Sequence, residues 1–311
     1  MPRSKRKGPG GPAHSSKRGR MGSVLGKDRK KDVPAQGFGR LAGARPARLL
    51  RKTCLVEASR GDPGQQWWDR LPVYTLTFAD PGAPLGVRID FGDVVKVVVP
   101  GVKPKSYSMS RQGEGEFDIT YKFYPGGACS GYLHGLAVGD NITCFARGAK
   151  RRAAGSHVGI VAFGVGITEG LPVAAAELAK GDAARVKLVW ASRTWADTFW
   201  HDELEALQAA HPGRFDVVHV LSREARDGCR NGRVDCGVLE AEFDGAWGTA
   251  PGGGTDRSGC RFLSVGTKPM MRAFDEMIQS LGYTHLKHQL LVRCDRDGGA
   301  NPRGVGLRER M

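Results

Sequence analysis

The sequence predicts a β domain followed by an α/β domain whose sheet is parallel and doubly wound. Two observations predict this fold class. Short apolar runs separated by turn residues fill the first half of the chain after its polar start, whereas in the second half such runs alternate with helix-like stretches. The first pattern is typical of an antiparallel sandwich or barrel, and the second is typical of a parallel sheet covered by helices.

The segment from Met1 to about Arg45 is rich in Gly, Pro, Ser, Lys and Arg and poor in large apolar side chains, so we predict that it is disordered. The 311-residue chain has a net charge of +15, and 16 of its 47 basic residues lie within the first 52 positions, beside only two acidic residues. The rest is almost neutral, which argues against a nucleic-acid-binding domain. The tail is either a solvated appendage or an address, nuclear through Lys5-Arg6-Lys7 or organellar, and nucleic-acid binding by the tail alone is a further hypothesis.

Between about Arg48 and Ala153, four runs rich in Val, Thr, Tyr and Phe lie between clusters of Gly, Pro and Asp. We predict strands at Val73 to Phe78, Val94 to Val99, Phe117 to Tyr124 and Asn141 to Phe145. This half is therefore predicted to be all-β. The pattern changes near residues 151–155, where we place the domain boundary.

After Ala154, an apolar run, a glycine turn, a helix-like stretch and another apolar run follow in order, which is the pattern of a βαβ unit. We predict strands at Val158 to Phe163, Val186 to Trp190, Phe215 to Leu221 and Arg261 to Val265. We predict helices at Pro172 to Lys180, Asp202 to Ala210 and Pro269 to Leu281. This alternation predicts the doubly wound sheet.

The seven cysteines, at positions 54, 129, 144, 229, 236, 260 and 294, form no CxxC pair and no cluster at zinc spacing. We therefore expect reduced thiols in an intracellular protein, cytoplasmic unless the tail directs it to the nucleus or an organelle. No window approaches the ~20 apolar residues of a membrane-spanning helix, and we expect no secretory signal. His285 and His288 have the spacing of one helical face but no third ligand, so we expect no metal site.

Two segments of the β half combine residue types suited to a phosphorylated aromatic ligand. In Lys105-Ser106-Tyr107-Ser108-Met109-Ser110 a cation, an aromatic ring and hydroxyls alternate, so a planar ring could stack while the cation faces a phosphate. In Tyr124-Pro125-Gly126-Gly127-Ala128-Cys129-Ser130 two glycines let backbone N–H groups approach closely, and a hydroxyl completes a phosphate cradle. The alternative interpretations are an ordinary edge strand and a Pro-Gly-Gly turn.

Two segments of the α/β half follow predicted strands. Gly164-Val165-Gly166 is not the full GxGxxG fingerprint, because Glu169 stands at the position of the third glycine. The second segment is Val265-Gly266-Thr267-Lys268-Pro269-Met270-Met271. Because the carboxyl ends of parallel strands meet at one edge of the sheet, both turns are expected to face one ligand.

In this order the four segments resemble the ferredoxin-NADP reductase superfamily, most closely its cytochrome b5 reductase and nitrate reductase flavin branch, over about Arg48 to Val292. The resemblance implies an antiparallel Greek-key β-barrel that binds FAD at residues 48–153 and an α/β domain that binds NAD(P) at residues 154–292. A disordered basic tail at residues 1–47 and a polar C-terminal extension at residues 293–311 complete the predicted organisation.

The resemblance also implies roles for single residues. Ser108, near the ring nitrogen that accepts hydride, and Thr168, between flavin and nicotinamide, are the implied catalytic residues. The implied FAD ligands are Lys105, Ser106, Tyr107, Ser108, Lys122, Tyr124, Gly126, Gly127, Cys129 and Ser130. The implied nicotinamide dinucleotide ligands are Gly164, Gly166, Thr168, Arg193, Gly266 and Met270.

This chain departs from the family pattern at several of these positions. Lys105 replaces an arginine and loses its planar, bidentate fork. Glu169 replaces a proline, and its carboxylate is expected to repel a dinucleotide pyrophosphate. Val265 replaces the cysteine that flanks the nicotinamide, Thr267 and Lys268 replace two prolines, and the C-terminal aromatic that covers the flavin is missing.

We therefore expect an FAD-dependent oxidoreductase that takes hydride from NADH or NADPH, with NADH favoured, and passes single electrons to a protein or metal-centre acceptor. Its expected partners are the nicotinamide dinucleotide and an electron-acceptor protein that no motif identifies. The alternative is a divergent flavin- or nucleotide-binding regulatory module with little hydride transfer, which Glu169 and Val265 motivate.

Overall fold

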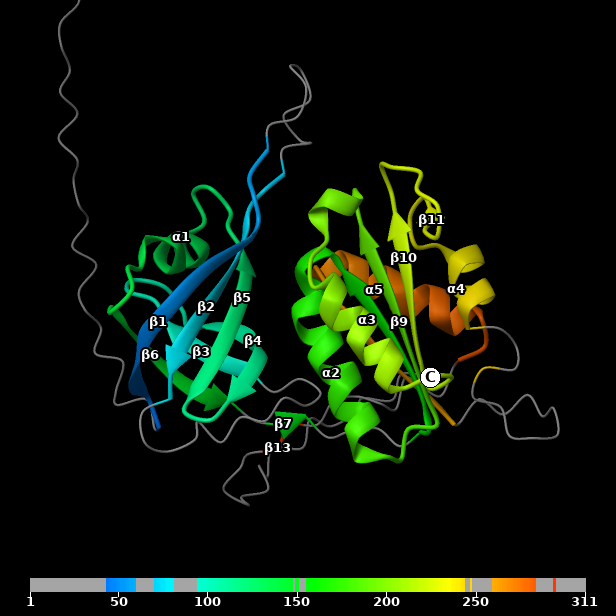
Figure 1. Ribbon diagram of the computed structural model, residues 1–311, viewed down its shortest axis with the longest axis horizontal. Helices are drawn as coiled ribbons and strands as arrows, with labels where there is room; N and C mark the ends of the chain where they lie inside the picture. Colours follow the sequence, from blue (N-terminus) through cyan, green and yellow to red (C-terminus); the bar gives the residue numbers. More distant parts are fainter. Residues whose placement is uncertain are drawn as a thin grey trace, which may run out of the picture. The chain divides into compact units, whose positions relative to one another are not determined.

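The computed structural model describes residues 43–59, 70–80, 94–147, 149–150, 155–243, 247, 259–283 and 293–294. Among these residues a closed β-barrel is followed along the chain by a parallel sheet with helices, so the predicted fold class is confirmed (Figure 1). Most of the predicted tail, His285 and His288, and all but the first two residues of the predicted C-terminal extension lie outside the described residues.

The barrel has the strand order β1-β2-β5-β4-β3-β6, and all neighbouring pairs are antiparallel. Its strands are β1 Arg45–Val56, β2 Val73–Ala79, β3 Val94–Val98, β4 Lys105–Gly113, β5 Glu116–Lys122 and β6 Asn141–Arg147. Helix α1, Ala128–Gly135, follows β5. Because β2 pairs with β5 rather than with β3, and β6 returns to pair with β1, the strands are connected in the Greek-key manner.

Two barrel strands lie outside the predicted apolar runs. Strand β1 begins at Arg45, within the predicted tail of residues 1–47, and it alternates basic with apolar residues. Strand β4 carries mainly polar residues, so its hydrophobic pattern is weak. Since β4 pairs with β3 on one side and β5 on the other, it is an interior strand and not the edge strand of the alternative interpretation.

A core of alternating side chains fills the barrel. Val95 and Val97 of β3 are fully buried, and Leu76 and Phe78 of β2 join them. Phe78 lies directly opposite Phe117 of β5, with the ring centroids 5.5 Å apart. Such cross-strand aromatic pairs are a main source of sheet stability.

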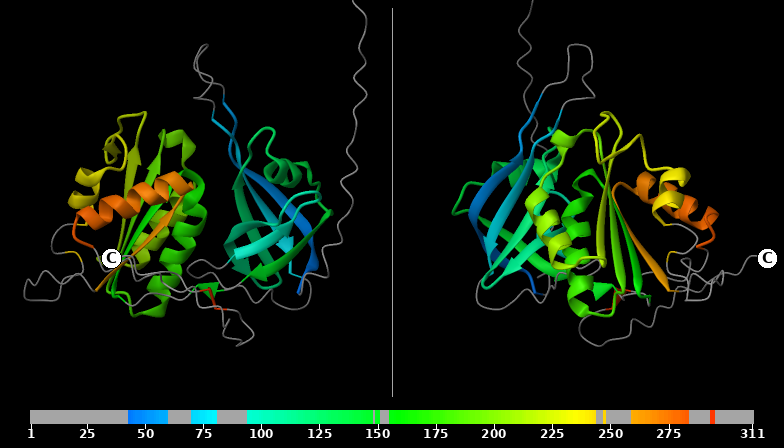
Figure 2. Two further views of the ribbon diagram at one scale, coloured as in Figure 1. Left: turned by 180° about the vertical axis from the view of Figure 1, so that it is seen from behind. Right: turned by 45° about the vertical axis from the view of Figure 1, so that its right-hand side comes forward.

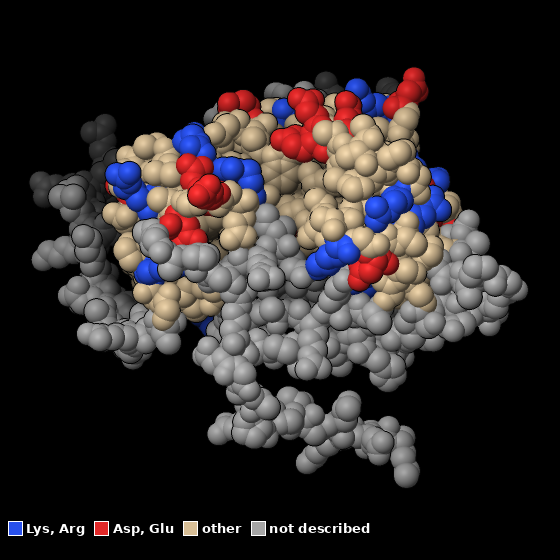
Figure 3. Space-filling model, turned by 60° about the horizontal axis from the view of Figure 1, so that its bottom comes forward, with Lys and Arg blue, Asp and Glu red and all other residues tan. Residues whose placement is uncertain are grey.

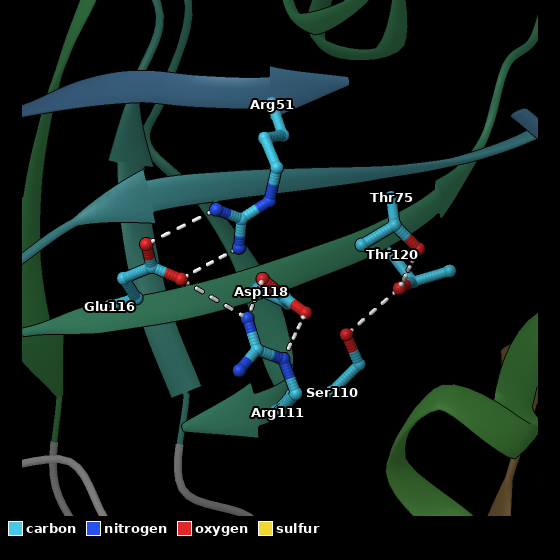
Figure 4. A network of polar contacts seen from close by, with 7 residues as sticks. All are labelled: Arg51, Thr75, Ser110, Arg111, Glu116, Asp118 and Thr120. Carbon is cyan, nitrogen blue, oxygen red and sulfur yellow. Dashed lines mark hydrogen bonds and ion pairs between the residues drawn. The ribbon is translucent and has the colours of Figure 1, made fainter. Parts of the chain in front are cut away.

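A polar network ties β4 to its neighbours (Figure 4). Its members are Arg51, Thr75, Ser110, Arg111, Glu116, Asp118 and Thr120. Arg111 Nε donates to Asp118 Oδ2 at 2.7 Å, and the hydroxyls of Ser110 and Thr120 are 2.8 Å apart. These contacts hold the second half of β4 against β5, and the first half, Lys105 to Ser108, pairs with β3.

The sheet of the second domain has the order β11-β10-β9-β8-β12, and its pairs are parallel. Its strands are β8 His157–Phe163, β9 Arg185–Ser192, β10 Phe215–Leu221, β11 Arg230–Asn231 and β12 Cys260–Val265. The helices are α2 Ile167–Lys180, α3 His201–Ala210, α4 Cys236–Glu242 and α5 Lys268–Ser280. Helix α2 begins five residues before Pro172, the predicted start, because a 3₁₀ turn at Gly164–Gly166 leads directly into it.

Helices cover both faces of this sheet (Figures 1 and 2). Ile160 and Ala162 of β8 pack in one cluster with Leu171 of α2, whereas the intervening Val161 packs with Phe274 of α5. Successive strand residues point to opposite faces, so the continuous apolar run of β8 serves two cores. This is why the predicted strands of this half show no polar alternation.

A short two-stranded sheet pairs β7, Ala149–Lys150, with β13, Arg293–Cys294. β13 holds the first two residues of the predicted C-terminal extension. In the part of the chain that the structure describes, none of the helices combines the length and apolar character needed to cross a bilayer.

His219 of β10 is expected to make the protein acid-sensitive. It lies opposite Trp190 and beside Trp195, its Nδ1 atom is buried without a hydrogen-bond partner among the described residues, and burial lowers its pKa to about 4. A histidine in the unfolded chain has a pKa near 6.5. The unfolded state therefore takes up a proton at a higher pH than the folded state does. The free energy of unfolding is thus highest above pH 6.5 and falls as the pH drops toward 4. Because solvent screens part of this effect, we expect a loss of about 2 kcal/mol.

Urea unfolding at pH 7 and pH 4.5 measures this loss. His219→Phe retains the aromatic packing but cannot titrate, so the variant should lose about 2 kcal/mol less than the wild type between the two pH values. Some acid sensitivity should persist, because burial also lowers the pKa of His201. Equal losses in variant and wild type would contradict the assignment.

Candidate active site

A cavity of about 1520 Å³ lies between the barrel and the carboxyl edge of the parallel sheet. It exceeds the ~300 to 1,000 Å³ of most small-molecule pockets. The barrel contributes β4, β5 and the loop before α1, and the sheet contributes residues that follow β8, β9, β10 and β12. The four sequence segments therefore meet at one place, and the predicted site residues all line the cavity except Gly126.

The first segment occupies the start of β4. Lys105 and Ser106 are exposed, Tyr107 and Ser108 are half-buried, and Met109 points into the barrel core. Burial raises the pKa of Tyr107 to about 12, so the phenol stays neutral. The strand thus brings a cation, a neutral aromatic ring and a hydroxyl to the cavity wall within four residues.

The second segment is a tight loop before α1. Gly126 has φ +74°, and a Cβ on Gly127 would lie 2.6 Å from Ser130 Oγ. The Ser130 hydroxyl donates to the Tyr124 carbonyl at 3.1 Å and accepts from the Tyr124 N–H at 3.2 Å. Ser130 therefore shapes the loop from within, and its predicted role as a phosphate ligand stays a prediction.

The third and fourth segments touch each other. A Cβ on Gly166 would lie 2.3 Å from the Val265 carbonyl oxygen, and a Cβ on Gly266 would lie 2.9 Å from the Phe163 ring. Trp190 Nε1 donates to the Gly164 carbonyl at 2.9 Å, which fixes the 3₁₀ turn. The two turns predicted to face one ligand are thus in direct backbone contact, and only glycine permits this approach.

Three charged side chains line the cavity near the ends of β5 and β9: Lys122, Arg193 and Asp197. Burial lowers the pKa of Lys122, while the carboxylate of Asp197 acts in the opposite direction. Arg193 Nη2 is 3.0 Å from Asp197 Oδ1, and Asp197 also accepts from the Thr194 hydroxyl. An anionic ligand would stabilise the charged form of Lys122, because it would replace lost hydration with an opposite charge.

The carboxylate of Glu169 lines the cavity and is hydrogen-bonded to the barrel. Ser108 Oγ donates a hydrogen bond to Glu169 Oε2 at 2.9 Å, although the two residues lie on β4 and in the first turn of α2. Glu169 is therefore engaged with the predicted catalytic serine, whereas the sequence suggested a carboxylate that repels a pyrophosphate. No local pattern predicts this contact, because it spans 61 positions.

Two hydroxyls of the cavity wall have no hydrogen-bond partner among the described residues. They are Tyr121 Oη, on a side chain 4% exposed, and Ser192 Oγ, on a side chain 8% exposed. Buried polar groups are normally paired, so both indicate a polar ligand in the cavity. Together with the cations Lys105 and Lys122, these hydroxyls fit a phosphorylated ring cofactor such as FAD.

The sequence interpretation missed several residues of the cavity wall. These are Tyr121, Ser192, Asp197, Ser222, Arg223 and Arg233. Ser222 directly follows the predicted strand Phe215 to Leu221, and Ser192 lies two positions after the predicted strand Val186 to Trp190, so the rule that ligands bind at the carboxyl edge could have found them. Tyr121 gives no such signal, because it belongs to the apolar run of β5 and packs in the barrel core.

Charges of both signs lie on the described surface that Figure 3 shows. On the face drawn in Figure 3, Lys and Arg are interspersed with Asp and Glu rather than gathered into one basic patch. This distribution agrees with the near-neutral composition outside the tail. It does not resemble the basic face of a nucleic-acid-binding domain.

Comparison with known proteins identifies a matching family model and several related reductases. Residues 160–276 match the family model of the oxidoreductase NAD-binding domain. NADH-cytochrome b5 reductase 1 of Aspergillus terreus is 30% identical over 218 residues, which cover 65% of this chain and 69% of that protein. Its counterparts from Arabidopsis thaliana and Mycosarcoma maydis are each 29% identical, and the chain spans 63% and 60% of their lengths.

Solved structures share the fold. The cytochrome b5 reductase domain of Ulva prolifera nitrate reductase gives a TM-score of 0.60 at 21% identity and covers 78% of this chain and 94% of that one. A ferredoxin NADP+ reductase from Neisseria gonorrhoeae with bound FAD and NADP gives a TM-score of 0.60 at 16% identity, with 78% and 93% coverage.

A closed antiparallel barrel, a doubly wound sheet and a shared cavity at the sheet's carboxyl edge are the two-domain fold of ferredoxin-NADP reductases. Within that superfamily, the chain belongs to the NADH-cytochrome b5 reductase family.

Proposed function

We propose that this protein is an FAD-dependent oxidoreductase that takes hydride from NADH or NADPH and passes electrons singly to a protein or metal-centre acceptor. The observation that carries the proposal is the single cavity lined by four segments from both domains, with two buried, unpartnered hydroxyls among its described walls. Relatives named as NADH-cytochrome b5 reductases support the same reaction class.

The barrel side of the cavity suits FAD. Lys105 and Lys122 offer positive charge to phosphate groups, and the neutral ring of Tyr107 offers a stacking surface. The Ser108 hydroxyl donates to Glu169, and its oxygen can still accept a hydrogen bond from the edge of a ring. When bound, FAD supplies the conversion of a two-electron donor into single electrons, and the protein supplies binding, orientation and exclusion of water.

The sheet side suits the nicotinamide dinucleotide. Gly164, Gly166 and Gly266 keep the turns free of side chains, and Thr168 is buried beside them. We propose NADH as the donor, in line with the named relatives. The positive charge of Arg193, Arg223 and Arg233 on the cavity wall supports NADPH as the alternative, because its extra phosphate would find a cationic end.

Anaerobic spectral titration tests the proposed function. The purified full-length chain is loaded with FAD, freed of excess flavin, and titrated separately with NADH and NADPH. We expect retained flavin absorbance that one of the two donors bleaches at close to one equivalent. Flavin bands that persist in excess of both donors would instead support the second candidate, a flavin-binding regulatory module, which Val265 in place of the family's cysteine favours.

Lys105→Arg should bind FAD more tightly. An arginine can make two parallel hydrogen bonds to a phosphate, whereas lysine acts as a point charge. We expect the dissociation constant to fall about tenfold, which corresponds to ~1.4 kcal/mol. Quenching of flavin fluorescence measures it.

Lys103→Arg is the matched control for this substitution. Lys103 is also exposed and also lines the cavity, but it precedes β4 rather than starting it. We expect its dissociation constant for FAD to change less than about twofold. Similar gains in both variants would show that general charge or size, and not the position of Lys105, is responsible.

We also propose that the protein is cytoplasmic, with nuclear or organelle targeting by the basic tail as the alternative. The six cysteines whose side chains the structure describes are thiols, which supports a reducing compartment. Imaging the full-length chain and a variant that lacks residues 1–45 separates the alternatives. A change of compartment on deletion would identify the tail as an address.

A further inference from the structure

Lys122, at the end of β5, is a half-buried lysine on the wall of the cavity. Its neighbour Tyr121 packs in the barrel core, and successive strand residues point to opposite faces, so Lys122 lies on the outer side of the barrel. Its ammonium group forms no hydrogen bond or ion pair with another residue that the structure describes. Lys122 is therefore a partly buried cation without a direct countercharge among those residues.

Two charged side chains of the α/β domain act on Lys122 in opposite directions. Asp197 attracts it and Arg193 repels it. Asp197 is already engaged, because its Oδ1 atom lies 3.0 Å from Arg193 Nη2 and its Oδ2 atom accepts from the Thr194 hydroxyl at 3.0 Å. Burial is the largest effect, and it lowers the pKa of Lys122. At neutral pH a larger share of this side chain is therefore a neutral amine than in a fully hydrated lysine.

Lys187 of β9 is a second lysine with little exposure, and it differs from Lys122 in having close partners. Its side chain is 12% exposed, and its Nζ atom lies 3.1 Å from Glu242 Oε2. The same atom donates to the Glu242 carbonyl oxygen at 2.9 Å. These contacts occupy the ammonium group, so Lys187 is the matched comparison for the unpaired Lys122.

A neutral lysine amine is a nucleophile, and burial is one of the means by which proteins produce such an amine. The surroundings of Lys122 favour an electrophile that carries negative charge, because Arg193 and Lys105 lie on the same cavity wall. An acyl phosphate combines an activated carbonyl carbon with a charged phosphate. Its phosphate would be held by the cations while its carbonyl meets the amine.

We propose that Lys122 is an acylation site for small acyl donors that carry a phosphate group. The lone pair of the amine attacks the carbonyl carbon, and a new N–C bond forms. The bond between that carbon and the phosphate oxygen breaks, and phosphate leaves with its electron pair. The proton that the amine loses passes to water, so the step needs no oxidant or reductant.

Acylation removes the positive charge of Lys122 and adds an uncharged group to the cavity wall. This consequence rests on the proposed function, because it requires that Lys122 contact a phosphorylated cofactor. Loss of the charge weakens the attraction for FAD phosphates. Acyl donors and FAD therefore compete for the same side chain, and acylation lowers the fraction of protein that holds its cofactor.

Peptide mass spectrometry of the full-length protein tests the site. The protein is treated with acetyl phosphate at pH 7.5, and acetylation is followed at each lysine over time. We expect Lys122 to react at least ~5-fold faster than the exposed Lys105 and at least ~10-fold faster than Lys187. The preference over Lys105 should shrink as the pH rises toward 11, because an exposed lysine also becomes neutral near its pKa of about 10.4.

Two comparisons test the role of the phosphate. Acetic anhydride carries no charge, so its preference for Lys122 should be smaller than that of acetyl phosphate. Arg193→Gln should slow the reaction of Lys122 with acetyl phosphate at least ~5-fold, because it removes a cation that binds phosphate. Arg185→Gln, at the opposite end of β9 and outside the listed cavity wall, is the control and should match wild type. Slow acetylation of Lys187 in each variant verifies that it is folded.

Flavin binding tests the consequence. Loading the protein with FAD should protect Lys122 at least ~10-fold and leave Lys187 unchanged. Lys122→Gln is an uncharged mimic of acetyl-lysine, and its dissociation constant for FAD should rise at least ~10-fold. Lys122→Arg keeps the charge but cannot be acylated in this way, and it should bind FAD within about threefold of wild type. Quenching of flavin fluorescence measures both.

The outcomes are distinguishable. Acetylation of Lys122 no faster than that of Lys105, or equally fast in Arg193→Gln, overturns the inference. Absence of protection by FAD, or a Lys122→Gln variant that binds FAD as wild type does, overturns the consequence for the cofactor. A bound flavin that NADH does not bleach overturns the proposed function instead, because acylation of Lys122 does not depend on flavin reduction.

Discussion

Glu177→Ala is expected to lower the free energy of unfolding by about 3 to 5 kcal/mol. Glu177 of α2 is 1% exposed and forms an ion pair with Arg261 of β12, which is 5% exposed. Lys180 also approaches Glu177, at 3.5 Å, but it reaches solvent. Removal of the carboxylate deprives the buried Arg261 guanidinium of this ion pair, and removing one partner of a buried ion pair is strongly destabilising.

Urea unfolding at pH 7 measures this loss, and two controls define its cause. Asp216→Ala breaks the exposed pair between Arg185 and Asp216, and it should cost less than ~1 kcal/mol. The double variant Glu177→Met, Arg261→Met replaces the buried pair with apolar side chains, and it should recover most of the lost stability. A double variant as unstable as Glu177→Ala would assign the loss to packing rather than charge.

Gly166→Ala is expected to slow flavin reduction by NADH about 100-fold. The backbone of Gly166 has φ −59°, which alanine adopts readily, so backbone strain does not contribute. Its added Cβ would instead lie 2.3 Å from the Val265 carbonyl oxygen, and the end of β12 must move. This displacement changes the cavity where the two turns meet, and a shift of ~1 Å at a reacting centre costs about that factor in rate.

Stopped-flow bleaching by NADH measures the rate, and thermal unfolding should show a loss of about 1 to 3 kcal/mol from overpacking. Gly131→Ala in α1 is the control, because no atom lies within 4 Å of its added Cβ. It should leave the rate unchanged and raise stability by about 0.5 to 1 kcal/mol through reduced backbone freedom. An unchanged reduction rate in Gly166→Ala would show that the contact between the turns does not shape the nicotinamide site.

The fold class was predicted from patterns of apolar and turn residues that extend over a few positions of the sequence. The apolar runs that became β8, β9, β10 and β12 alternate with helix-like stretches, and this alternation indicated a parallel sheet covered by helices. Part of strand β4 was predicted only as an edge strand, in the alternative interpretation. Its place between β3 and β5 was missed, because it carries mostly polar residues and depends on pairing with distant partners. The first three residues of β1, Arg45 to Ala47, were assigned to the tail, which was defined by its Gly, Pro, Ser, Lys and Arg content.

The candidate site, like the fold, was predicted only in part from the sequence. The glycine turns after β8 and β12 were predicted to face one ligand, because the carboxyl ends of all strands in a parallel sheet lie at the same edge. The bond between Ser108 and Glu169 and the buried, unpartnered hydroxyl of Tyr121 were not predicted, because both depend on how the barrel and α2 present single side chains to the cavity.

The sequence by itself determined the two domain types, the family and the four segments that line the cavity, since periodicity and glycine placement are local properties of the chain. Only the tertiary structure decided that the carboxylate of Glu169 meets Ser108, that Ser130 shapes its own loop and that Arg261 depends on Glu177. These contacts depend on where the folded chain places single side chains, because Ser108 and Glu169 are 61 positions apart and Glu177 and Arg261 are 84 positions apart.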